Sequence, residues 1–205
     1  MIEVKKICEI LEKEYKNAEC SLKFKSDFQL LVMSRLSAQC TDVRVNKVSV
    51  ELFKKFPDAS SFMNADVSEI EEIIKPCGLF KVKANDLKEM CTLLVNKFNS
   101  KIPYGMDNLQ QLQGIGRKTA NLIMSEVFHV PSIIVDTHVS RVSKRLGFHN
   151  EKSIIKIENI LKEYIDKKNW SNFCHQTVFH GRKVCKARNP DCLNCCLQKY
   201  CRRCL

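Results

Sequence analysis

The chain has 205 residues, of which 44% are hydrophobic and 28% charged, a composition that fits a globular protein of one domain or two small ones and excludes a largely disordered chain. No segment approaches membrane-spanning length and the N-terminus lacks an apolar signal core, so we expect a cytoplasmic protein that does not use a membrane. The net charge of +11 favours a polyanionic partner, with nucleic acid ahead of an anionic membrane surface.

Apolar residues recur at helical spacing along most of the chain, which predicts an all-α fold of roughly ten helices. In the long segment 83–98 the apolar side chains of Leu87, Met90 and Leu94 are expected to point inward. The run 133–135, Ile-Ile-Val, fits either a short strand or extended core chain. The clearest helical segments are residues 1–16, 28–36, 43–53, 68–74, 83–98, 137–146, 153–164 and 172–178.

Cap-type residues predict where two of the helices begin. Ser68 stands three and four residues before Glu71 and Glu72, which is close to the spacing of a capping box. Asp107 and Asn108 precede an apolar stretch and predict the N-cap of a short helix.

Residues 109–123 read as a short helix, a tight glycine hairpin and a second helix. Gly114 and Gly116 interrupt the helical period, and both allow a positive φ and leave backbone N–H groups uncovered. Such a turn before a helix N-terminus favours a bound phosphate. Lys118 falls in the first turn of the second helix, where the helix dipole, Arg117 and desolvation should disfavour its charged form. A P-loop does not fit, because Arg117 intrudes and a helix precedes the glycines.

Three further segments carry polar residues at helix boundaries. Residues 37–46, Ser-Ala-Gln-Cys-Thr-Asp-Val-Arg-Val-Asn, fit a helix-capping turn, and residues 74–84 fit a helix stop followed by a core leucine. Asp136 precedes a helical segment, where an N-cap is the commonest role of aspartate. His138 is expected to form structural hydrogen bonds rather than to act in catalysis.

Half of the twelve cysteines fall in the last 21 residues, which favours a metal site over a disulfide framework. Two sets of four thiolates compete. One has the spacing C-x2-C-x5-C-x2-C and superficially resembles a zinc site, although zinc sites usually have a spacer of about 15–20 residues. The other has the spacing C-x6-C-x2-C-x5-C. The first set is Cys192, Cys195, Cys201 and Cys204, and the second is Cys185, Cys192, Cys195 and Cys201.

The motif Leu-x-Gly-Ile-Gly-Arg-Lys-Thr-Ala-Asn at residues 112–121 resembles the helix-hairpin-helix of the endonuclease III family of DNA glycosylases. Further motifs of that family are similar to three other segments, residues 37–42, 78–84 and 135–142, and to the second cysteine spacing. The resemblance implies an all-α helix-hairpin-helix glycosylase fold. It divides the chain into a six-helix barrel domain over 20–130, with the hairpin at about 107–128, and a second helical domain. That second domain comprises 1–19 and 131–205 and holds a 4Fe-4S cluster loop at 185–201.

The resemblance also implies roles for individual residues. Lys118 and Asp136 would be catalytic, Gln39 would fill the gap left by a flipped-out base, and Leu79 would wedge between bases. The hairpin at Gly114, Gly116 and Arg117 would hold a DNA phosphate. The local excess of basic residues separately predicts that the basic loop meets phosphate at Lys186 and Arg188. The cluster ligands would be Cys185, Cys192, Cys195 and Cys201, which leaves Cys196 and Cys204 without an assigned role.

The function implied is base-excision repair by a bifunctional enzyme. It would remove oxidised pyrimidines from double-stranded DNA and cleave the abasic site by β-elimination through a Schiff base on Lys118. Adenine glycosylases of the same superfamily lack a lysine at this position. We expect a monomer. The alternatives are a non-catalytic DNA-binding protein with a redox or structural cluster, a monofunctional glycosylase, and a zinc-stapled structural protein.

Overall fold

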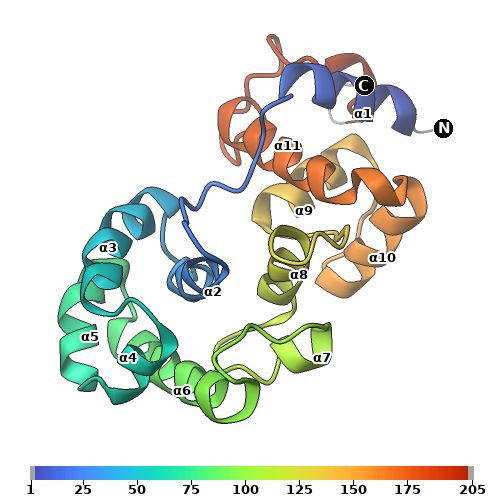
Figure 1. The fold of residues 1–205 in the computed structure, drawn as a ribbon. Helices are drawn as coiled ribbons and strands as arrows, with labels where there is room; N and C mark the ends of the chain where they lie inside the picture. Colours follow the sequence, from blue (N-terminus) through green and yellow to red (C-terminus); the bar gives the residue numbers. More distant parts are fainter. Residues whose placement is uncertain (1–2, 203–205) are drawn as a thin grey trace. The chain divides into compact units, whose positions relative to one another are not determined.

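The computed structural model describes residues 3–202, and the regular secondary structure within this range is entirely helical (Figure 1). The predicted all-α class is therefore confirmed. The α-helices are α1 (Val4–Glu14), α2 (Asp27–Leu36), α3 (Asp42–Lys55), α4 (Ala59–Asn64), α5 (Val67–Ile74), α6 (Phe80–Phe98), α7 (Met106–Leu109), α8 (Arg117–Glu126), α9 (Thr137–Leu146), α10 (Ile154–Tyr164) and α11 (Trp170–Lys183). Three short 3-10 helices join them: η1 (Lys75–Cys77), η2 (Lys167–Asn169) and η3 (Gln198–Tyr200).

The chain forms two compact units. One is the continuous segment Ser21–Phe128, which contains α2 to α8. The other combines the described residues up to Cys20 with those from His129 onward, and so contains α1 and α9 to α11. Within this second unit α1 packs against α11, so the first helix of the chain is part of the C-terminal core. No described helix is long and apolar enough to cross a bilayer.

In the unit Ser21–Phe128 the long helix α6 packs against α2, α4 and α5. The predicted inward residues Leu87, Met90 and Leu94 are fully buried, as expected. The helix begins at Phe80, three residues before its predicted start.

The capping box predicted at Ser68 is wrong. Helix α5 begins one residue earlier, at Val67, because the Asp66 carboxylate accepts a hydrogen bond from the Ser68 backbone N–H at 3.0 Å. A capping box does occur at α4, where Asp58 Oδ1 accepts from the Ser61 N–H at 2.8 Å and Ser61 Oγ accepts from the Asp58 N–H at 3.2 Å.

A buried ion pair joins α2 to α6. The Arg35 guanidinium donates two hydrogen bonds to Asp86 Oδ2, one from Nε at 2.7 Å and one from Nη2, and each side chain is only 11% exposed. Gln113, in the turn before α8, donates to the other oxygen of the same carboxylate at 3.3 Å. This pair therefore links two helices to the segment that contains the glycines.

Asp86→Ala is expected to lower the free energy of unfolding by about 3 kcal/mol, because Arg35 would keep its buried charge without a partner. The matched control is Glu69→Ala, which removes the Lys55–Glu69 pair, whose side chains are 46% exposed. That change should cost no more than about 1 kcal/mol. Urea unfolding of both variants gives the comparison, and equal losses would contradict the assigned importance of the buried pair.

Candidate functional site

The glycine hairpin lies between α7 and α8, as the interrupted period predicts. The predicted cap at Asp107 and Asn108 is wrong: α7 is a four-residue helix that begins at Met106, and Gly105 is its N-cap. Because Gly105 has a φ of 95°, the chain turns into α7 in a conformation that glycine tolerates best.

Gly114 and Gly116 have different roles in the hairpin. Gly114 has a φ of +75°, and a Cβ atom there would overlap the Nε and Cδ atoms of Arg35, so both the conformation and the packing require glycine. Gly116 is extended, with φ −92° and ψ 178°, and is the N-cap of α8. Since it has no side chain, it gives no capping oxygen to the N–H groups of the first turn. A helix N-terminus of this kind favours an anion.

Lys118 lies in the first turn of α8, as predicted, and its side chain is exposed. The expected desolvation of Lys118 is therefore absent in the free protein, and only a bound partner could supply it. Arg117, next to it, is half-buried. The structure thus places one accessible amine beside an uncapped helix N-terminus.

Gln39 and Leu79 occupy two loops of the same unit. Gln39 follows α2 and is exposed, and Leu79 precedes α6 and is 54% exposed. Both residues have a positive φ, 53° for Gln39 and 50° for Leu79, and residues other than glycine rarely adopt such a backbone conformation. Two strained residues, one of them an exposed leucine, are typical of positions kept for contact with a partner.

Asp136 is the N-cap of α9, as predicted, and belongs to the other unit. Its Oδ1 accepts a hydrogen bond from the Val139 N–H at 2.7 Å, and its side chain is half-buried. The preceding run 133–135 is buried, extended chain and not a strand. Cys174 Sγ on α11 accepts from the Ile134 N–H at 3.2 Å, which fixes this run. Asp136 is thus held rigidly through one of its two carboxylate oxygens.

His138 has the structural environment that its sequence context predicts. Its Nδ1 lies 3.1 Å from Arg141 Nη2, and burial lowers the pKa of the imidazole from its ordinary value. A neutral ring whose Nδ1 accepts from a guanidinium is consistent with a structural role.

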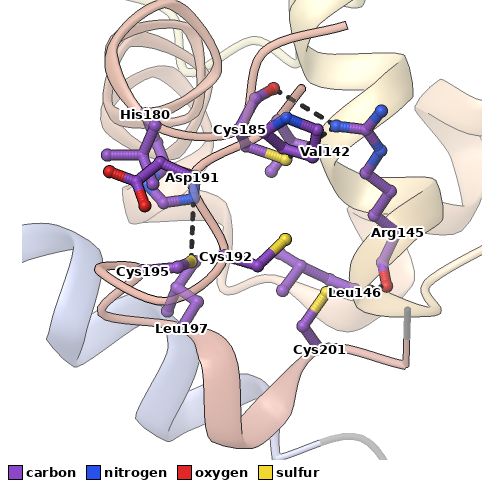
Figure 2. Close-up of a pocket in the computed structure, with 12 residues that line it drawn as sticks. Val142, Arg145, Leu146, His180, Cys185, Asp191, Cys192, Cys195, Leu197 and Cys201 are labelled. Carbon is purple, nitrogen blue, oxygen red and sulfur yellow. Dashed lines mark hydrogen bonds between the residues drawn. The ribbon is translucent and has the colours of Figure 1, made fainter. Parts of the chain in front are cut away.

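The structure brings the cysteines at positions 185, 192, 195 and 201 to a single pocket, whose lining includes Leu146 and Leu197 (Figure 2). The space among these residues is about 360 Å³, open solvent included. Cys196 is exposed and does not line the pocket, and Cys204 lies outside the described residues. Within residues 3–202, no three His, Cys, Asp or Glu side chains meet at the spacing of a single metal ion.

The donor set of this pocket fits an iron–sulfur cluster. Four thiolates around a largely apolar cavity are the usual protein ligands of a 4Fe-4S cluster. Burial raises the pKa of the Cys195 thiol to about 11, so a positive metal centre would be needed to hold it as a thiolate at neutral pH. His180 lies next to Cys195, with Nε2 3.6 Å from Sγ, and its Nδ1 is 3.0 Å from the hydroxyl of Tyr15, the residue that follows α1. Burial lowers the pKa of His180 to about 4, so its ring is neutral near pH 7.

Two arginines of α9 hold the basic loop, a role that the sequence analysis missed. Arg145 donates to the carbonyl oxygens of Lys186 at 2.7 Å and Ala187 at 3.1 Å, and to Cys185 Sγ at 3.2 Å. Arg141 donates to the Cys185 carbonyl from Nε at 3.2 Å. Arg141 and Arg145 stand four residues apart, so the sequence already indicated that both lie on one face of the helix after Asp136. With its backbone fixed in this way, the loop presents Lys186 and Arg188 as exposed side chains.

Comparison with known proteins identifies the family. Residues 32–167 match the HhH-GPD superfamily of base excision DNA repair proteins. Endonuclease III of Synechocystis sp. is 43% identical over 193 residues, which cover 94% of this chain and 88% of the relative. Endonuclease III of Bacillus subtilis is 40% identical over 189 residues, which cover 92% and 86%.

Solved structures agree with this assignment. A non-covalent endonuclease III–DNA complex matches with a TM-score of 0.94 and 40% identity, covering 98% of this chain and 96% of the other. A trapped covalent endonuclease III–DNA intermediate matches with the same TM-score and identity, covering 98% and 97%. The chain therefore belongs to the endonuclease III family, within the HhH-GPD superfamily of base excision DNA repair proteins.

Proposed function

We propose that this protein is a bifunctional DNA glycosylase and abasic-site lyase that removes oxidised pyrimidines from double-stranded DNA. The observation that carries the proposal is the accessible Lys118 amine beside the uncapped N-terminus of α8. A relative that is 40% identical has been solved as a trapped covalent intermediate with DNA, which supports covalent chemistry in this family.

In the proposed reaction, the neutral Lys118 amine attacks C1′ of the damaged nucleotide and the bond from C1′ to the base breaks. The base leaves with a proton, and opening of the sugar gives a Schiff base between Nζ and C1′. Loss of a proton from C2′ then breaks the bond from C3′ to its phosphate oxygen, which cleaves the strand by β-elimination. Duplex DNA lying over the hairpin would supply the desolvation that Lys118 lacks in the free protein.

Asp136 would stabilise the positive charge that develops on the sugar and assist proton transfer as the base leaves. Its hydrogen bond to the Val139 N–H holds one carboxylate oxygen in place. The N-cap role and the catalytic role are compatible, because a capping carboxylate is both charged and rigidly placed.

Three parts of the unit Ser21–Phe128 would contact the duplex. The backbone N–H groups of Gly114 and Gly116, with Arg117, would hold a phosphate, and such contacts position DNA without reading its sequence. Gln39 would fill the space left by the extruded nucleotide and Leu79 would insert between bases. Extrusion costs a few kcal/mol, and damaged, poorly stacked bases reduce that cost.

In the other unit, Cys185, Cys192, Cys195 and Cys201 would hold a 4Fe-4S cluster, which would crosslink a segment that has little core of its own. The cluster would keep the basic loop with Lys186 and Arg188 ready for phosphate contact. We also propose a cytoplasmic location, which the metal-type spacing of the C-terminal cysteines supports over a disulfide framework.

Lys118→Gln should abolish strand cleavage, because the amide has no nucleophilic amine. We expect the nicking rate on a duplex with one oxidised pyrimidine to fall at least about 1,000-fold. Affinity for the same duplex should change by less than about tenfold, because one cation is lost. The control is Lys54→Gln, which removes an exposed lysine on α3. Undiminished nicking by Lys118→Gln would contradict the mechanism, and a wild-type protein that binds without nicking would be a DNA-binding module.

The hairpin is tested with two glycine variants. Gly114→Ala should lower the free energy of unfolding by about 2 kcal/mol, from the left-handed backbone and the overlap with Arg35. Gly116→Ser should keep stability within about 0.5 kcal/mol, because the position is extended and serine is a favoured N-cap. Its hydroxyl would accept from the first-turn N–H groups and compete with phosphate, so duplex affinity should fall at fixed salt. Wild-type affinity in Gly116→Ser would exclude a phosphate site at this turn.

The cluster assignment is tested by iron content and colour. Purified protein should be yellow-brown and contain about four irons per chain. Cys192→Ser should lose iron and thermal stability, whereas Cys196→Ser should keep both, because Cys196 is exposed and outside the pocket. A colourless, zinc-containing preparation, or equal iron loss in the two variants, would overturn the assignment.

A further inference from the structure

Lys83 is a buried cation that the proposed chemistry does not use. Its side chain is 0% exposed and is among the largest fully buried side chains of the described residues. Within residues 3–202 its ammonium group is in no ion pair and donates instead to two main-chain carbonyl oxygens, those of Leu36 at 2.8 Å and Cys77 at 3.0 Å. Burial lowers the pKa of Lys83 from its ordinary value, and a lysine is rarely kept in such a place without a reason.

The two carbonyl groups lie at the ends of two different elements. Leu36 is the last residue of α2, and Cys77 is the last residue of η1. Carbonyl groups at a helix C-terminus have no partner within the helix, so a donor from elsewhere satisfies them. The loop after Leu36 contains Gln39, and the loop after Cys77 contains Leu79. A single ammonium group is therefore bonded to the start of the Gln39 loop and to the start of the Leu79 loop.

Lys83 also fixes the second loop through its backbone. Its N–H donates to the Leu79 carbonyl at 3.0 Å, which forms the first hydrogen bond of α6. Residues with a Cβ keep a positive φ only where their surroundings hold them. At Leu79 those surroundings include the backbone N–H of Lys83 and the ammonium group bonded to the Cys77 carbonyl. At Gln39 they include the bond from the ammonium group to the end of α2.

We propose that Lys83 is a positioning residue that holds the loops of Gln39 and Leu79 in one fixed arrangement, so that both enter the duplex together. The proposal rests on the proposed function, because it assigns those two loops to DNA. Lys83 itself is too deeply buried to touch the nucleic acid and acts through the two carbonyl groups. A methionine of similar shape would fill the space but leave both carbonyls without a donor.

The test compares Lys83→Met with Lys88→Met. Lys88 is a matched control, because it lies on the same helix and donates to a helix-end carbonyl, that of Ala65 at 2.7 Å, which belongs to neither loop. The first measurement is amide hydrogen exchange without DNA. In Lys83→Met two amides should exchange faster together: that of Cys40, bonded to the Ser37 carbonyl, and that of Gly78, bonded to the Lys75 carbonyl. Lys88→Met should leave both unchanged.

The second measurement separates base extrusion from lysine chemistry. On a duplex with one oxidised pyrimidine, Lys83→Met should lose at least about tenfold in kcat/KM, because a small misplacement of inserting groups is costly. On a single-stranded oligonucleotide with an abasic site, which has no base stack to enter, the variant should lose less than about twofold in kcat/KM.

A fluorescent base placed opposite the lesion reports base extrusion directly. Its fluorescence should increase when the wild-type protein binds and should increase less when Lys83→Met binds. Lys83→Gln, whose amide can donate to one carbonyl, should be intermediate and serves if the methionine variant folds poorly.

The outcomes are distinguishable from failure of the proposed function. If exchange is faster in both loops but the wild-type protein does not nick DNA, the positioning role of Lys83 stands and the proposed enzymatic function is rejected. Faster exchange in only one loop, or in neither, would overturn the proposal even in an active enzyme. Equal losses on the duplex and single-stranded substrates would also overturn it, because they would show a general loss of folded protein.

Discussion

Charges buried in the unit Ser21–Phe128 must find partners inside the protein, and the loops proposed to meet DNA depend on this constraint. Asp86 and Lys83 lie three residues apart on α6, so they share a face of that helix. Asp86 pairs with Arg35 and accepts from Gln113 before the glycine hairpin, while Lys83 bonds the ends of α2 and η1. A buried charge without a partner lowers stability more than an ordinary lost contact does. These bonds therefore constrain the Gln39 loop, the Leu79 loop and the glycine hairpin.

The C-terminal segment, residues 184–202, has few buried side chains to hold it in place. Between residues 184 and 202 only Leu197 and Cys201 are buried, and the basic loop from Lys186 to Asn189 is exposed. Hydrogen bonds from Arg145 fix the backbone of that loop, and the four-cysteine pocket provides the ligands for the proposed cluster. In the proposed cluster-bound protein, metal coordination would replace hydrophobic burial as the main source of order in this segment.

Features set by neighbouring residues were predictable from the sequence, and features set by distant residues were not. The glycine hairpin and the N-cap at Asp136 follow from local backbone preferences. The Arg35–Asp86 pair joins residues 51 positions apart and the bond from Lys83 to Leu36 spans 47, and helical periodicity assigns such side chains to the surface. The error at Ser68 has a local cause, because Asp66 is an equally good cap two residues away.

The central claim is that Lys118 forms a covalent bond with the damaged nucleotide, and borohydride trapping followed by mass spectrometry tests it most directly. Wild-type protein would be incubated with one duplex that carries an oxidised pyrimidine and another that carries an abasic site. The account predicts a reduced adduct on both duplexes, with the modified peptide containing Lys118. An adduct on a different lysine, or none from well-folded, cluster-containing protein, would contradict it.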